Sequence, residues 1–289
     1  MPSTSWLAPL SLMVAATVWG LVWYPYRLLE QAGLSGCLAS LITYLAAALP
    51  LLPVVRRGWR LPPAQRGWML AVALTAGWTN LSYVLAVIHG EVIRVLLLFY
   101  LAPLWTLLFA RFFLHERAGR LGLAIIGLSL AGAIVMLQRG TGLPLPASPA
   151  EWMGLGSGIG FALSNVLTRK VCETPIAIRS LWVFLGVVGI SLLSVSANGE
   201  AFGALARLDM PHWLMVAGVA LTLVLATFAV QYGLAHTPAN QAIVILLSEL
   251  VVAAVSSQLL AGEVMEMREW IGGAMIVAAT LFSGRMSHA

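Results

Sequence analysis

Long apolar runs, separated by short polar connections, follow one another along the whole chain. Each run is roughly 20 residues long, the length at which a helix crosses a hydrocarbon core of about 30 Å. The pattern predicts an all-α polytopic membrane protein with ten transmembrane helices. We place the spans near 6–29, 36–55, 66–88, 92–113, 119–137, 151–169, 179–197, 212–235, 239–260 and 270–285.

The composition agrees with this interpretation. Of the 289 residues, 60% are hydrophobic and only 9% are charged, whereas a soluble domain carries about 25% charged residues. The formal net charge is +5, but the basic side chains lie in short connections and do not form one patch. We therefore expect the lipid bilayer as a partner and no nucleic acid.

The basic connections also predict the orientation. If ten spans alternate, eleven Lys and Arg residues fall on one side of the membrane and five on the other. Basic loops stay cytoplasmic, so we expect both chain termini of this multi-pass protein inside. Cys37 and Cys172 then lie on opposite sides, which argues against a disulfide between them.

Two parts of the sequence resemble each other. "LFYLAPLWTLLFARFFLHE" (98–116) and "ILLSELVVAAVSSQLLAGE" (245–263) both end an apolar span with a glutamate, and a Gly-rich span follows each. The two glutamates are 147 residues apart, and "WGLVWYPYR" (19–27) precedes "FALSNVLTR" (161–169) by 142. We predict two five-helix repeats, 1–140 and 150–289, joined by a linker at 141–149. An odd number of spans inverts the second repeat, which is typical of alternating-access carriers.

With these features the chain resembles the EamA branch of the drug/metabolite transporter superfamily. Within it, the chain is most similar to the YddG-type bacterial exporters of aromatic amino acids and related metabolites. The resemblance implies a basket-like helix bundle with a central cavity between the repeats. It also implies a location in a bacterial inner membrane and a small-molecule substrate, with aromatic amino acids expected.

Polar and aromatic residues inside the spans are the candidates for substrate binding, because polar groups in hydrocarbon are costly and should face other helices or a wet cavity. Each of them could instead pack against a neighbouring helix. Trp19 and Trp23, for example, share one face of the first span with Tyr26. The candidates are Trp19, Trp23, Asn80, Tyr83, Tyr100, Ser164, Asn165, Gln231, Ser248 and Glu249.

Pro103 predicts a kink or a gating break in the fourth span, because proline removes a backbone hydrogen bond. The second repeat has Leu250 at the corresponding position, where the family often carries a second proline. The sequence therefore supports a break in the fourth span and leaves open whether the ninth span has one.

Glu249 lies near the middle of the ninth predicted span, about 16 Å from either end. An acid at that depth costs roughly 2.5–3.5 kcal/mol, so a polar partner, cavity water or protonation must offset it. The sequence allows either a protonated glutamate bonded to a neighbouring helix or a cavity group that meets a substrate amine or a proton.

Catalytic, metal-binding and cofactor-binding patterns are missing from the sequence. The other acids and all five histidines fall in connections or at span ends, and there is no HExxH motif or phosphate loop. We expect neither an enzyme nor a cofactor or metal site. The alternatives to amino acid export are a proton-coupled exporter of cationic drugs and, more remotely, a passive pore or scaffold. The oligomeric state stays open.

Overall fold

The computed structural model describes residues 6–53, 63–89, 95, 98–137, 146–198, 202–261, 266–283 and 285. Within them the secondary structure is helical. Residues 56–62 of the arginine-rich connection, positions 141–145 of the predicted linker and Glu263 lie outside the described residues. In chain order the segments are α1 (Leu7–Gln31), α2 (Gly36–Ala48), η1 (Leu49–Leu51), α4 (Pro63–His89), α6 (Ala102–Phe109), η2 (Ala110–Leu114), α7 (Arg120–Leu137), α8 (Pro149–Lys170), α9 (Ile176–Ala197), η3 (Phe202–Arg207), α10 (Met210–His236), α11 (Ala239–Leu246), α12 (Glu249–Ala261) and α13 (Met267–Phe282).

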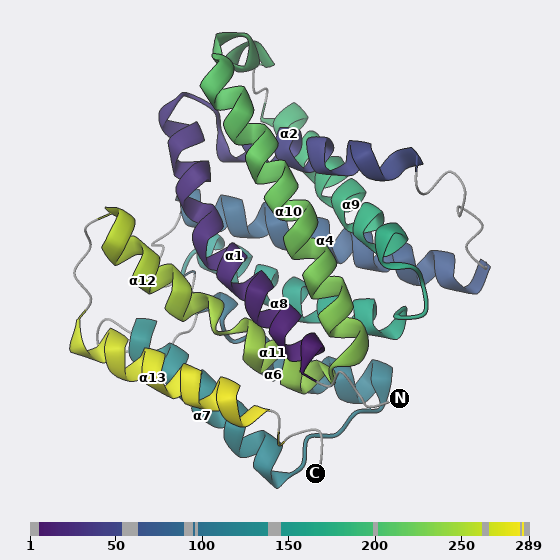
Figure 1. Ribbon diagram of the computed structural model, residues 1–289, viewed down its shortest axis with the longest axis vertical. Coiled ribbons are helices and arrows are strands. Elements are labelled where there is room, and N and C mark those ends of the chain that lie inside the picture. Colours follow the sequence, from purple (N-terminus) through teal and green to yellow (C-terminus); the bar gives the residue numbers. More distant parts are fainter. Residues whose placement is uncertain are drawn as a thin grey trace.

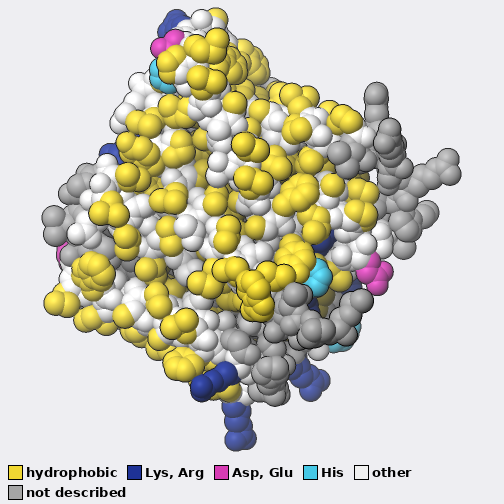
Figure 2. All heavy atoms as spheres, in the orientation of Figure 1, with side chains coloured by type: hydrophobic (Ala, Val, Ile, Leu, Met, Phe, Trp, Pro, Cys, Tyr) yellow, Lys and Arg dark blue, Asp and Glu magenta, His cyan; other side chains and the backbone are white. Residues whose placement is uncertain are grey.

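Several of these helices have the length and composition of membrane spans. Among the described residues, five stretches of 22 to 27 residues are apolar enough to cross a bilayer, namely Leu7–Gln31, Gln65–Ala86, Ile176–Ala197, Met210–His236 and Ala239–Leu260. Figure 2 shows apolar side chains spread across the middle of one face, with charged side chains mostly toward its edges. This distribution is what a surface surrounded by lipid requires.

The helices pack in pairs that join segments far apart in the sequence. α4 packs along α8 and α9, while α1 packs along α10 and α12. α7 and α13 lie side by side at one edge of the bundle (Figure 1). α6 and α11 also contact each other, so the two shortest of these helices meet inside the bundle.

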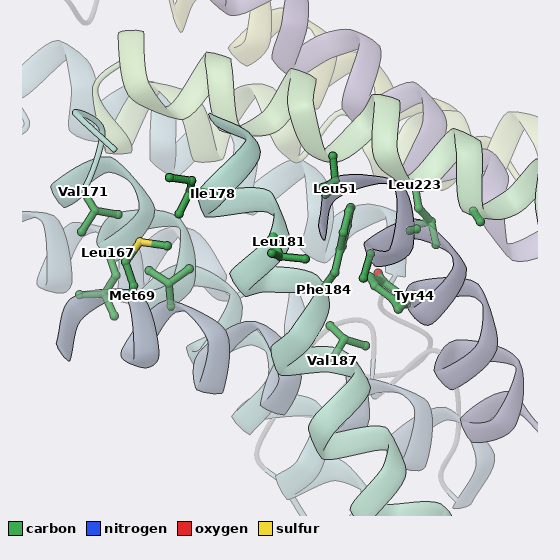
Figure 3. Close-up of a cluster of buried hydrophobic side chains, with 14 of the residues drawn as sticks. Tyr44, Leu51, Met69, Leu167, Val171, Ile178, Leu181, Phe184, Val187 and Leu223 are labelled. Atoms are coloured by element: carbon green, nitrogen blue, oxygen red, sulfur yellow. The ribbon is translucent and has the colours of Figure 1, made fainter. Parts of the chain in front are cut away.

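A buried apolar core lies among α2, α4, α8, α9 and α10 (Figure 3). Phe184 of α9 is fully buried at its centre and contacts the ring of Tyr44 edge to face, with 5.8 Å between the ring centroids. Burying an aromatic side chain of this size stabilises the fold by about 1.5–3 kcal/mol. The core holds α9 against α2 and α4.

Several helices begin with a side-chain cap. Ser148 accepts a hydrogen bond from the backbone of Glu151 at the start of α8, and Asp209 does the same for His212 at the start of α10. The hydrogen bond to the His212 side chain holds the pKa of Asp209 below its usual value. Glu266 and Glu269 form a capping box that begins α13.

Two apolar stretches that would be long enough to form continuous spans are broken near their middles. In the first, a turn at Tyr100 and Leu101 precedes α6. In the second, Leu247 and Ser248 separate α11 from α12. Only the first has a proline at the start of the new helix, Pro103. The ninth predicted span therefore has a break where the sequence had left the question open.

Backbone hydrogen bonds at both breaks join residues three apart, as in a tight 3₁₀ turn. At the first, the Leu101 amide donates to the Leu98 carbonyl at 3.3 Å. At the second, the Leu250 amide donates to the Leu247 carbonyl at 3.1 Å. The Ser248 hydroxyl also donates to the Ile245 carbonyl at 2.7 Å, so it satisfies an acceptor at the end of α11.

Candidate functional site

Glu249 is the first residue of α12, directly after the second break. Its side chain is partly buried, and within the described residues it has no ion-pair partner. The amino end of a helix carries a partial positive charge, which favours a carboxylate there. The break therefore places an acid at a helix terminus inside the bundle, where a straight helix would offer no such stabilisation.

Four aromatic rings surround the first break. Phe99 is at their centre, 5.4 Å from the Tyr83 ring, 5.2 Å from the Tyr100 ring and 5.4 Å from the Phe161 ring, measured between centroids. The rings come from α4, α8 and the residues just before α6. Tyr83, Phe99, Tyr100 and Phe161 are called the aromatic cluster below.

The aromatic cluster and Glu249 lie close together. Leu247 and Leu250, which flank the second break, pack in the same buried group as Phe99 and Tyr100. Glu249 directly precedes Leu250, so the acid lies beside this group, and Tyr83 also packs against it. The structure therefore brings three of the candidates predicted from the sequence to one place, from three separate segments.

At each break, a backbone carbonyl packs closely against a glycine of another helix. A Cβ atom on Gly158 of α8 would lie 2.5 Å from the Phe99 carbonyl oxygen, and one on Gly20 of α1 would lie 2.8 Å from the Glu249 carbonyl oxygen. Both distances are shorter than any ordinary contact, so only glycine fits at either position without a shift. These glycines were not among the predicted site residues.

A second set of buried polar side chains lies on α8 and α10. Asn165 is 8% exposed and Gln231 is 2% exposed, and in the described part of the chain the Asn165 Nδ2 and Gln231 Oε1 atoms have no hydrogen-bond partner. Arg169, one turn after Asn165, donates to the Leu234 carbonyl one turn after Gln231. The two amides therefore lie at a similar depth on neighbouring helices.

The remaining candidates lie on α8, on α4, at the second break and at the start of α6. Ser164 is buried one turn from Phe161 on α8. Asn80 is one turn before Tyr83 on α4, and its Oδ1 has no partner among the described residues. Ser248 uses its hydroxyl for the Ile245 carbonyl. Pro103, which is buried, is in the first turn of α6.

The two tryptophans of α1 do not join the aromatic cluster. Trp19 packs against the core around Tyr44 and Phe184. The Trp23 indole N–H donates to the Ser256 hydroxyl of α12 at 3.0 Å. Helical spacing predicts that they share a face, but only the packing of α1 shows which neighbours each of them contacts.

A groove of about 480 Å³ lies between α4, α8 and α9, beside Trp78 and away from the aromatic cluster.

Phe99 and Phe161 were not predicted as site residues, although each is close in sequence to a predicted one. Phe99 directly precedes Tyr100, and Phe161 is three residues before Ser164 on α8. A phenylalanine in a membrane span carries no polar signal, so the sequence alone does not distinguish it from lipid-facing residues. Within the described residues, no group of three or more His, Cys, Asp or Glu side chains could hold a metal ion.

Comparisons with known proteins show where the chain belongs. It is 25% identical over 225 residues to RarD of Salmonella typhi, covering 75% of this chain and 74% of that protein. It is 26% identical over 218 residues to an uncharacterized transporter of Archaeoglobus fulgidus, covering 75% and 76%. A crystal structure with 17% identity covers 98% of this chain and 99% of its own, with a TM-score of 0.75, and shows that the fold is shared. The sequence model of the EamA-like transporter family matches twice, over residues 6–138 and 148–285, so the chain belongs to this family of membrane transporters.

Proposed function

We propose that the protein exports aromatic amino acids and related small metabolites, and that the substrate binds between the aromatic cluster and Glu249. The observation that carries this proposal is the meeting of four rings and one carboxylate at two broken helices. Stacked and edge-to-face rings contribute about 0.5–1.5 kcal/mol per pair beyond their buried area. A substrate ring can exchange such contacts with Tyr83, Phe99, Tyr100 or Phe161.

The charged groups of an amino acid need partners of opposite kind. The Glu249 carboxylate suits the α-ammonium group, since charge-assisted hydrogen bonds are roughly twice as strong as neutral ones. Asn165 Nδ2, which has no hydrogen-bond partner among the described residues, suits the α-carboxylate together with the nearby Ser164 hydroxyl, and Gln231 and Asn80 offer further polar atoms. Such a site binds one end of the substrate on α12 and the other on α8.

Alternating access in a bundle built from two inverted halves, 1–140 and 150–289, is part of the proposal. The double match of the family model supports it. So does the packing, because α6 of the first half packs on α8 of the second, while α12 of the second half packs on α1 of the first. We also propose that both termini are cytoplasmic and that the protein is in a bacterial inner membrane, as the basic connections favour.

Transport by purified protein in liposomes tests the substrate. We expect saturable flux and counterflow of tryptophan and phenylalanine. Tyr100→Leu should raise KM for tryptophan about fivefold through the loss of ring contacts. Trp19→Leu is the matched control, because Trp19 lies in a different core and its loss should leave KM unchanged. Robust flux of another metabolite, with none of tryptophan or phenylalanine, would refute the substrate; non-saturable flux would indicate a pore.

The absence of an ion-pair partner for Glu249 among the described residues favours a second candidate, a proton-coupled exporter of cationic drugs. In that mechanism the carboxylate releases a proton when a cation binds. Flux of an organic cation should then follow a pH gradient and disappear in Glu249→Gln. Flux that ignores the gradient and survives the substitution would exclude this candidate.

A further inference from the structure

An ion pair joins two distant segments at the end of the bundle where α8 and α10 finish. Arg169 Nε donates to Glu116 Oε1 at 2.5 Å, and the two side chains are 23% and 20% exposed. The other ion pairs in the described part of the chain are local, within Asp209–His212 and Glu266–Arg268. The Glu116–Arg169 pair alone among these connects residues 53 positions apart.

The backbone around Glu116 is held in an unusual conformation. The π-helical turn η2 follows α6, and His115 after it has a left-handed backbone with φ of 59°. The Glu116 amide then donates to the Ala110 carbonyl at 3.1 Å. A left-handed residue other than glycine costs free energy and is found where the surrounding structure requires it. The turn ends the helix and directs Glu116 toward α8.

Both members of the pair also bind the ends of other helices. Glu116 Oε2 accepts the Ala239 amide, the first residue of α11, at 2.8 Å. Arg169 Nη1 donates to the Leu234 and Ala235 carbonyls at the end of α10, at 3.2 and 3.4 Å. Carboxylates favour helix beginnings and guanidinium groups favour helix ends. One ion pair therefore fastens together η2, α8, α10 and α11.

A neighbouring lysine reinforces this junction. Lys170 Nζ donates to the Phe113 carbonyl of η2 at 3.0 Å and lies 5.0 Å from the centroid of the Trp68 ring of α4. At the position of α1 that corresponds to Arg169 by the 142-residue offset, Arg27 is exposed and lies 5.9 Å from the Trp23 ring centroid. The two arginines, related by the repeat, have different surroundings.

We propose that Glu116 and Arg169 form an ionic latch that closes the cytoplasmic end of the transport path. The inference rests on the proposed alternating-access function and on cytoplasmic ends for α8 and α10. α8 carries Phe161, Ser164 and Asn165, and α11 leads to Glu249. Separation of the latch frees these helices to move apart and exposes the substrate site to the cytoplasm.

A cysteine reporter measures the state of the latch without any substrate. In a background with Cys37→Ser and Cys172→Ser, Ser164→Cys places a thiol one turn from Phe161. A membrane-impermeant maleimide is applied to the cytoplasmic face of inside-out vesicles. Glu116→Gln should raise the labelling rate about tenfold, because loss of one charge-assisted pair shifts a two-state equilibrium by roughly that factor. Arg169→Gln removes the other charge of the pair and should raise the labelling rate by a similar factor.

Glu173→Gln is the matched control, because Glu173 is an exposed acid in the connection that follows α8. Its labelling rate should equal that of the parent. If Glu116→Gln and Arg169→Gln both label at the control rate, the latch is refuted, and either variant is sufficient should the other fail to fold. Fast labelling without tryptophan flux would keep the latch and refute only the substrate. Normal tryptophan flux together with control-rate labelling of both variants would keep the substrate and refute the latch.

Discussion

The breaks before α6 and before α12 have similar geometry and different side chains. The 147-residue offset aligns Tyr100 with Leu247, Ala102 with Glu249 and Pro103 with Leu250. The first break carries two aromatic rings and a proline, whereas the second carries a serine and an acid. Each therefore contributes what the other lacks, and the aromatic cluster meets a carboxylate where they lie together.

The comparison also shows that proline is not needed for a break. The second break occurs at Leu247 and Ser248, which are not prolines. Like the first break, it has a backbone hydrogen bond between residues three apart. Each break rests on a glycine whose missing side chain lets a backbone carbonyl approach, Gly158 for the first and Gly20 for the second. Packing against these glycines, more than the local residue type, is common to both.

Removal of the acid from the second break should have the largest effect. With Glu249→Gln the substrate ammonium loses a charge-assisted hydrogen bond of about 1.5–3 kcal/mol. Flux of tryptophan in liposomes should fall about ten- to a hundredfold, with thermal stability unchanged or raised. Glu173→Gln serves as the control. Wild-type flux in Glu249→Gln would show that the aromatic cluster binds substrate without the acid.

Filling either glycine contact should destabilise the corresponding break. Gly158→Ala forces a Cβ against the Phe99 carbonyl, and Gly20→Ala forces one against the Glu249 carbonyl. We expect a loss of about 1–3 kcal/mol in the free energy of unfolding for each, with Gly158→Ala the larger. Gly127→Ala of α7 is the control, since its Cβ would meet nothing within 4 Å. Equal stability of all three variants would contradict the role of these contacts.

Introduction of proline at the second break should be tolerated. Leu250→Pro removes the hydrogen bond from the Leu250 amide and some buried contact, but the position lies in the first turn of α12, where proline fits. We expect a loss of about 1 kcal/mol in a denaturation experiment. Val255→Pro in the interior of α12 should cost about 3 kcal/mol or more. Similar losses for both would mean that the break is not present.

Loss of the serine hydroxyl at the second break should have the smallest effect. Ser248→Ala removes the hydrogen bond to the Ile245 carbonyl, and we expect a loss of about 0.5–1.5 kcal/mol. Leu101→Ala, at the aligned position of the first break, removes no such bond and serves for comparison. A drop in tryptophan flux for Ser248→Ala, without a change in stability, would instead place Ser248 in the substrate site.

The sequence predicted the positions of the helices well because apolar length is set by the bilayer. It did not predict the break between α11 and α12, since Leu247 and Ser248 are not helix breakers and the glycine that supports this break is in α1. Trp19 and Trp23 were predicted as substrate-binding residues, yet Trp19 packs against the core around Tyr44 and Phe184 and Trp23 donates to Ser256 of α12. Such features depend on contacts between separate segments of the chain, which helical spacing within one segment does not encode.

The contact between α4 and α9 limits which parts of the transporter can move. A Cβ on Gly186 would lie 2.0 Å from the Ala73 carbonyl oxygen, and one on Gly77 would lie 2.4 Å from the Gly186 carbonyl oxygen. Two helices whose backbones touch cannot slide or rotate past each other without collision. We therefore expect α4 and α9 to move as one unit, although they fall in different predicted halves of the chain. In the proposed alternating access, we therefore expect each moving part to contain helices from both predicted halves, 1–140 and 150–289.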